Sequence, residues 1–268
     1  LQSQLPAGTN IALCIEQPCQ NLINFFTQFP LLKLYLVNPA LIKRYRESLS
    51  PSKAKDDRRD AHALALFLYE RHTRLEPLTI PDPLAHQIAT LTEKRRQLVD
   101  TRTSLSNRLT QTLKDYFPQT LRLVGRDLFA PLACALLTKW PTLQHLQKTR
   151  PTTITRFYHK QGSRRPKVIE ERLQLIANAH PMCTDPALLE VYQALTQALA
   201  KQLHQIQTSI QKFDRLIAQK LTAHRDAKLF TSLPGAGPAF AARLLGFFGS
   251  DRSRYQDAAA LQKHSGVA

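Results

Sequence analysis

The chain has 268 residues, and its 43% hydrophobic content is enough for a real core in one large or two ordinary domains, which excludes a chain disordered throughout. Its 37 Lys and Arg outnumber its 20 Asp and Glu to give a formal net charge of +17, which favours a polyanionic partner, nucleic acid first. A membrane surface is the rival partner, but the longest apolar stretch, residues 128–137, contains a proline and is too short to cross a bilayer. We therefore expect a cytoplasmic protein without a membrane segment.

The cysteines and the first residues bear on zinc binding and on secretion. Cys14, Cys19, Cys134 and Cys183 form no CxxC pair and have no histidine at zinc-finger spacing, so we expect reduced, structural thiols. The chain begins with LQSQ, without an initiator methionine or a signal peptide, and from this we expect that the true amino terminus lies upstream.

The first 75 residues alternate between strand and helix patterns. Residues 10–15 and 32–37 are short apolar runs of strand length, and residues 21–29 between them have helical spacing. A basic helix is predicted over residues 40–48. A further helix is predicted over residues 57–72, with Ala61, Leu64, Ala65 and Leu68 on its buried face. The order strand, helix, strand, helix predicts a parallel βαβ unit.

Two long amphipathic helices are predicted next, over residues 86–117 and from Pro186 to about residue 221. The spacing of apolar residues in the second is nearer that of a straight helix than a strict heptad. The two helices could pair within one chain or between protomers. The stretch between them, residues 120–185, looks less regular.

A basic cluster lies in that stretch, within SRRPK at residues 163–167. Its charged side chains are Arg164, Arg165 and Lys167. Such a cluster is either a solvated loop or a nucleic-acid contact, and the sequence alone leaves both interpretations open.

Three carboxylates form a candidate catalytic and metal site. Glu16 ends the first predicted strand, and Asp57 and Asp60 are three residues apart at the start of a predicted helix, so both lie on one helical face. Functional groups gather at the carboxyl ends of the strands of an open α/β sheet, and hard oxygen ligands suit Mg²⁺, which supports phosphodiester chemistry. In the alternative interpretation Asp56 or Asp57 caps the helix and Asp60 is a first-turn carboxylate.

A glycine hairpin, Pro-Gly-Ala-Gly-Pro at residues 234–238, precedes an apolar helix over residues 239–248. Exposed backbone amides at Gly235 and Gly237 could hold a phosphate at the start of that helix, as helix-hairpin-helix modules do. An ordinary turn between helices is the alternative.

Two segments carry a family resemblance. Glu16 followed by LYLVNPALIKRYRESLSPSKAKDDRRDAHALA, and later KLFTSLPGAGPAFAARLLGFFGSDRSRY with AAALQKHSGVA, closely resemble the one-ten family of insertion-sequence transposases, including its eleven-eleven subgroup. That family has an RNase H-like, RuvC-like domain with a DEDD tetrad. The resemblance assigns its Glu to Glu16 and its Asp-x-x-Asp to Asp57 and Asp60. The family's first Asp and its nucleophilic serine have no counterpart in this chain.

The resemblance and the patterns together predict three regions. Residues 1–75 would form a truncated α/β domain of the RNase H/RuvC type, residues 76–225 a helical, coiled-coil-like region with a basic middle segment, and residues 226–268 the start of an all-α, helix-hairpin-helix-like transposase domain.

The resemblance implies a DNA transposase or recombinase that binds element ends and target DNA, cleaves and rejoins strands, uses Mg²⁺, works with an element-encoded structured RNA and forms a homo-oligomer. Because one tetrad member and the serine are missing, we expect this chain to be inactive by itself. A RuvC-like junction nuclease and a non-enzymatic basic helical nucleic-acid-binding protein are the alternatives.

Overall fold

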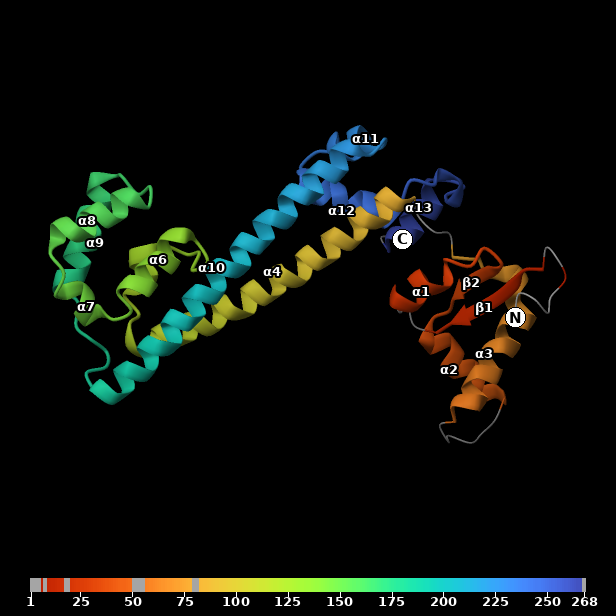
Figure 1. Cartoon of the computed structure of the whole chain (residues 1–268), viewed down its shortest axis with the longest axis horizontal. Coiled ribbons are helices and arrows are strands. Elements are labelled where there is room, and N and C mark those ends of the chain that lie inside the picture. The colour runs from red at the N-terminus through yellow and green to blue at the C-terminus, as the bar shows by residue number, and fades with distance from the viewer. Residues whose placement is uncertain (1–5, 7–8, 17–19, 50–55, 79–81, 267–268) are drawn as a thin grey trace. The chain divides into compact units, whose positions relative to one another are not determined.

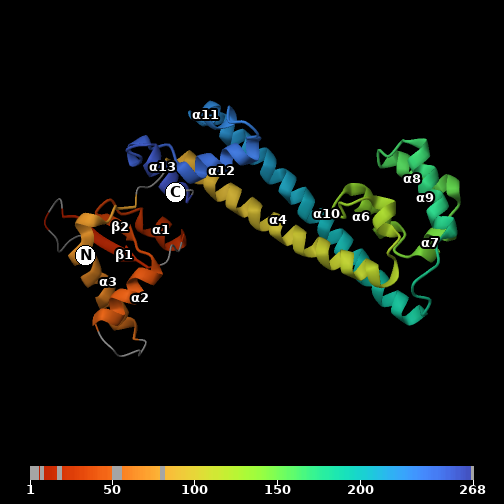
Figure 2. The ribbon, with the colours of Figure 1, turned by 180° about the vertical axis from the view of Figure 1, so that it is seen from behind.

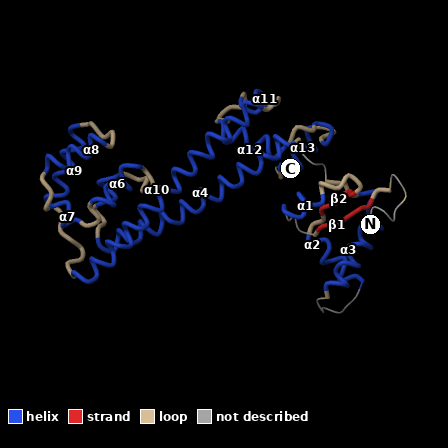
Figure 3. Tube along the Cα trace, viewed as in Figure 1, coloured by secondary structure: helices blue, strands red, loops and turns tan. Residues whose placement is uncertain are grey.

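The computed structural model describes residues 6, 9–16, 20–49, 56–78 and 82–266. The chain divides into two compact units, residues 1–81 (unit 1) and residues 82–268 (unit 2) (Figure 1). Helices make up most of the described chain, and the strands lie in unit 1 (Figure 3).

Unit 1 contains the predicted βαβ arrangement. Strands β1 (Ile11–Ile15) and β2 (Leu32–Leu36) pair in parallel, with Ile11 opposite Leu32, and helix α1 (Gln20–Phe26) connects them. Both predicted strands and their parallel pairing are therefore confirmed. The two are the whole sheet within the described residues.

Helices α2 (Pro39–Leu49) and α3 (Asp57–Arg71) follow, and a short 3₁₀ turn, η2 (His72–Arg74), comes directly after α3. Helix α3 packs on β1 and on α2, and Figure 2 shows α2 and α3 side by side next to the strands. The core of the unit is built around Val37, Ile42 and Phe67.

The predicted face of α3 was partly wrong. The buried residues are Ala63, Phe67 and Leu68, while Ala61 and Ala65 are exposed. Apolar residues occur on nearly every side of this helix, so periodicity alone did not choose a face. The large ring of Phe67, which meets the ring of Tyr45 edge-on at 5.1 Å between centroids, sets the rotation because it has the most area to bury.

Unit 2 is entirely helical in its described part. Its helices are α4 (Pro83–Tyr116), α5 (Thr120–Val124), α6 (Pro131–Lys139), α7 (Leu143–Gln147), α8 (Pro151–Lys160), α9 (Pro166–Asn178), α10 (Pro186–Ala223), α11 (Ala227–Thr231), α12 (Pro238–Phe248) and α13 (Ala258–Ser265), with the 3₁₀ turn η3 (Arg252–Arg254) before α13.

The two predicted long helices are α4 and α10, and they pair with each other within the chain, running antiparallel (Figure 1). Polar pairs cross their seam at two levels. Arg95 binds Asp214 at 2.5 Å, and Arg102 donates to Gln207 at 2.9 Å. Partly buried polar pairs are satisfied in only one alignment of the helices, so they fix the register of the pair.

The stretch from residue 120 to 185 is not irregular as predicted, since it contains five helices, α5 to α9. Three of them begin with a proline at their first position, Pro131, Pro151 and Pro166. Proline is favoured there because its missing N–H has no acceptor in the first turn. These prolines therefore mark the starts of three of the helices.

The main core of unit 2 joins these short helices to the facing ends of α4 and α10. Leu113, Leu136, Leu146, Tyr158 and Leu203 are among its most deeply buried members. The hydroxyl of Tyr158 donates to the carbonyl of Leu123 at 3.4 Å. The short helices are therefore an integral part of the unit.

A second core holds α12 against the opposite end of the long pair, around Ile88, Ile217 and Leu245. Gly246 makes this close crossing possible, because a Cβ there would stand 2.9 Å from the Cα of Ala89. Asp82 links three segments at the same end: it accepts from the backbone amides of Leu84 and Ala85, from the Ser250 hydroxyl, and from Nε2 of the buried His224.

Within the described residues there is no helix long and apolar enough to cross a membrane. Cys14, Cys134 and Cys183 are free thiols, and Cys19 lies outside the described residues.

Candidate functional site

The start of α3 carries the two predicted aspartates. Asp56 is the N-cap: its backbone is extended and its carboxylate accepts from the amide of Arg58 at 3.1 Å. Capping therefore belongs to Asp56, and Asp57 and Asp60 lie in the first turn without that duty. Asp57 is exposed and Asp60 half-buried.

Arg46 on α2 is the residue at this site that the sequence did not indicate. Its guanidinium binds the carboxylate of Asp60 at 2.5 Å. The hydrogen bond to Asp60 raises the pKa of Arg46, and the negative charges of Asp60, Glu16 and Glu47 raise it further. Glu16, at the carboxyl end of β1, and Asp60 thus share the field of one cation.

The three predicted metal ligands are Glu16, Asp57 and Asp60. Their carboxylate oxygens are the hard donors that Mg²⁺ prefers. Across the described residues, however, no group of three or more His, Cys, Asp and Glu side chains gathers at metal-binding spacing. Asp60 has the Arg46 guanidinium as its cation instead. The donor chemistry fits Mg²⁺, but the arrangement described here does not form a metal centre.

The basic cluster lies at the start of α9. Arg165 is the N-cap residue, Pro166 follows it, and no side chain caps the helix. Arg164, Arg165 and Lys167 are exposed, and in the described part of the chain their side chains make no hydrogen bond or ion pair. Cations are unfavourable at the positive end of a helix dipole, so this placement costs stability and concentrates positive potential for an anion.

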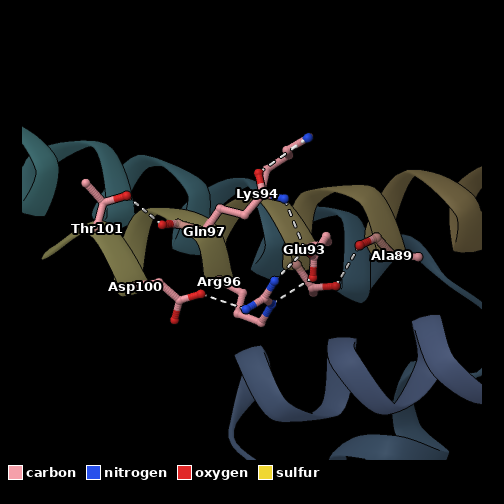
Figure 4. A network of polar contacts seen from close by, with 8 residues as sticks. Ala89, Glu93, Lys94, Arg96, Gln97, Asp100 and Thr101 are labelled. Atoms are coloured by element: carbon pink, nitrogen blue, oxygen red, sulfur yellow. Dashed lines mark hydrogen bonds and ion pairs between the residues drawn. The ribbon is translucent and has the colours of Figure 1, made fainter. Parts of the chain in front are cut away.

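Several arginines of α4 contrast with that cluster, because they are engaged within the chain. Arg96 binds Glu93 at 2.8 Å and Asp100 at 2.6 Å (Figure 4). The hydrogen bond from Arg96 lowers the pKa of Glu93 to about 2. Arg95 and Arg102 hold the α4–α10 seam, as described above. These three side chains are less available to a nucleic acid than those at the start of α9.

The glycine hairpin connects α11 to α12. Gly235 has a φ of +75°, which favours glycine, whereas Gly237 is the N-cap of α12 with an ordinary φ of −63°. Both glycines are exposed, and no described side chain caps α12. The predicted helix, turn and helix are present, although α11 is only five residues long.

Comparisons with known proteins indicate the class of protein to which the chain is related. Residues 3–118 match a family model described as a transposase, of the IS110 DEDD type. The mini-circle putative transposase for IS117 of Streptomyces coelicolor is 29% identical over 240 residues, which are 88% of this chain and 58% of that protein.

Two further relatives also come from insertion elements. An uncharacterized 44.8 kDa protein of insertion element IS116 of Streptomyces clavuligerus is 27% identical, over 81% of this chain and 53% of that protein. An uncharacterized 43.6 kDa protein of insertion element IS110 of S. coelicolor is 24% identical, over 86% and 56%. The chain thus spans a little more than half the length of the relatives that it matches.

These similarities support first a class and then a family. The chain is related to the transposases of insertion sequences. Within that class, the family model and the relatives support the IS110 family, as the resemblance of the sequence implied.

Proposed function

We propose that this chain forms part of an insertion-sequence transposase that binds DNA and takes part in cutting and rejoining its strands. The observation that carries the proposal is the transposase match over residues 3–118, which includes Glu16, Asp57 and Asp60. The basic cluster of unit 2 and the net charge of +17 support a nucleic-acid partner.

In the protein at the full length of its relatives, we propose that Glu16, Asp57 and Asp60 are the acidic residues of the reaction and that Mg²⁺ is their ion. The cap formed by Asp56 favours Asp57 and Asp60 as the functional pair, because it leaves both carboxylates free of a capping role. Within this chain, Arg46 holds the carboxylate of Asp60 in place, and its charge offsets part of the repulsion between Asp60 and Glu16.

The partners follow from the same proposal. Element ends and target DNA would contact Arg164, Arg165, Lys167 and the hairpin at Gly235 and Gly237. A structured RNA encoded by the element and a second copy of the protein are further partners that rest on the family resemblance alone.

The test is a transposition assay on the protein extended to the length of its relatives. Asp57→Asn with Asp60→Asn is expected to abolish transposition while DNA affinity stays within about twofold, since neither residue is proposed to hold phosphate. Asp56→Asn is the matched control: it removes a neighbouring charge, but asparagine caps a helix about as well as aspartate, so transposition is expected to persist.

One observation favours a second candidate function. Within the described residues the three carboxylates do not gather as a metal site. A protein that only binds nucleic acid needs no such site. A basic helical nucleic-acid-binding protein would lose nothing when Asp57 and Asp60 become asparagine. Full activity of that double variant would therefore contradict the catalytic proposal.

A further inference from the structure

A groove in unit 2 lies between α6 and α10, beside the end of α8. Its volume is about 660 Å³. The side chains that line it come from segments far apart in the sequence: Pro131, Cys134, Ala135, Thr138, Lys139, Gln161, Ala200, Lys201 and His204. Pockets of some 300 to 1,000 Å³ hold ligands of the size of a nucleotide.

The polar side chains of the groove include two cations and a histidine. Lys201 and His204 are exposed, three residues apart on α10, and so lie on the same face of that helix. Lys139, at the end of α6, also lines the groove, and its Nζ lies 4.3 Å from the centre of the Trp140 ring and 5.9 Å from that of the Phe157 ring. Among the described residues that line the groove there is no Asp or Glu, so an anion meets no repulsion from its walls.

The floor of the groove is apolar and chemically inert. The buried Ala200 and the half-buried Ala135 supply small aliphatic surfaces, and the exposed Pro131 borders the groove. Cys134 is buried, its thiol lies 3.4 Å from the carbonyl of Leu128, and burial raises its pKa to about 11. A thiol in that state is a poor nucleophile, so the groove is suited to binding and not to covalent chemistry.

An apolar floor beneath a cationic rim matches one kind of ligand in particular. A flat base can lie on aliphatic surface while its phosphate meets the rim. A base in a duplex is stacked and paired and cannot enter such a concave site without being flipped out. Gln161, one of the lining residues, is three residues before Arg164 of the basic cluster in the sequence.

We propose that the α6–α10 groove binds an unpaired nucleotide of a nucleic-acid strand, with its base on the floor and its phosphate at Lys139, Lys201 and His204. This inference rests on the proposed function for the presence of nucleic acid, and it adds where and in which form the strand is held. The shared chemistry is a nucleotide phosphodiester, and the strand can be DNA or RNA.

The experiment measures the affinity of the whole chain for labelled 20-nucleotide single-stranded DNA, single-stranded RNA and duplex DNA by fluorescence anisotropy at several salt concentrations. Lys201→Ala with His204→Ala is expected to weaken single-strand binding about tenfold and to lower the salt slope by about 0.7 for the lost lysine contact. Lys212→Ala, an exposed lysine on α10 outside the groove, is the control and is expected to change affinity less than twofold.

A second variant separates the base from the charge. Ala135→Phe fills the floor and leaves every charge in place, so it is expected to weaken single-strand binding and to leave duplex binding unchanged. Circular dichroism and the fluorescence of Trp140, the one tryptophan of the chain, check that each variant is folded. The tighter of the two single strands identifies the nucleic acid concerned.

The inference alone would be overturned by single-strand affinity within twofold of the unaltered chain in both groove variants. Equal losses of duplex and single-strand affinity would overturn it as well. Equal losses in the Lys212→Ala control would also overturn it, because they would reduce the effect to net charge. If the unaltered chain binds none of the three nucleic acids, the proposed DNA partner fails with it.

Discussion

Each unit contains an arginine–aspartate ion pair with an N···O distance of 2.5 Å, and the two pairs have different structural roles. Arg95 and Asp214 join the two long helices of unit 2, and Arg102 with Gln207 adds a second polar level to the same seam. Arg46 and Asp60 join α2 to α3 in unit 1, where the charge of Glu16 also acts on the arginine. The first pair fixes the register of a helix pair, whereas the second ties Asp60 to α2 within the field of Glu16.

The two units also differ in the size of their buried cores. Unit 2 has a large buried core that involves α4 to α10 and a second one under α12. The described core of unit 1 depends on Val37, Ile42 and Phe67. Because burial of apolar area is the main stabilising contribution, we expect unit 1 to be the less stable unit and to unfold separately.

Truncating one core side chain in each unit gives the largest expected effects. Phe67→Ala should destabilise unit 1 by about 3–5 kcal/mol, and Leu203→Ala should destabilise unit 2 by about 2–5 kcal/mol. Hydrogen exchange reports on both units, while the fluorescence of Trp140 reports on unit 2 alone.

Each truncation is the control for the other. Phe67→Ala is expected to remove amide protection from α3 and to leave the Trp140 unfolding midpoint unchanged, and Leu203→Ala to do the reverse. A shift of the Trp140 midpoint by Phe67→Ala would show that the units unfold together and would contradict the comparison.

A smaller effect is expected on the stability of unit 2 at low pH. Partial burial opposes the charge on Asp82, but hydrogen bonds from Ser250, the amide of Ala85 and His224 outweigh it and hold the pKa of Asp82 well below its ordinary value. A carboxylate with a lowered pKa contributes stability that is fully present above about pH 4 and is lost as the pH falls through its folded-state pKa. Unit 2 should therefore lose stability below about pH 4.

Asp82→Asn is expected to reduce that acid dependence and to cost about 1 kcal/mol at neutral pH, at the low end for a charged hydrogen bond because the side chain is partly exposed. Thermal unfolding of both proteins between pH 3 and 7, followed by Trp140 fluorescence, measures it. An unchanged slope of stability against pH would remove Asp82 as the cause.

Local patterns predicted the elements that repeat a clear period. The parallel strands were predicted from short apolar runs of strand length, and α4 and α10 from helical spacing of apolar residues that persists along them. The short helices α5 to α9 were missed because few of them are long enough to show a period. The face of α3 was misplaced because its apolar residues surround the helix and only tertiary packing of Phe67 chose among them.

In the candidate sites, too, local features could be predicted and features that depend on tertiary packing could not. Asp57 and Asp60 could be identified within one helix turn, and the cap at Asp56 follows a local rule. Arg46 was not predicted because its contact with Asp60 depends on how α2 packs on α3. The α6–α10 groove was beyond sequence reasoning, since Ala135, Gln161 and Lys201 meet only in the folded unit.

We propose that unit 1 carries the acidic residues of the reaction and that unit 2 carries the contacts to nucleic acid. The most direct measurement is the salt dependence of duplex DNA binding by this chain, with two variants compared. Arg164→Ala, Arg165→Ala and Lys167→Ala together are expected to weaken binding and to lower the slope of log affinity against log salt by about two to three. Asp57→Asn with Asp60→Asn is expected to leave the slope unchanged, and the reverse pattern would contradict the claim.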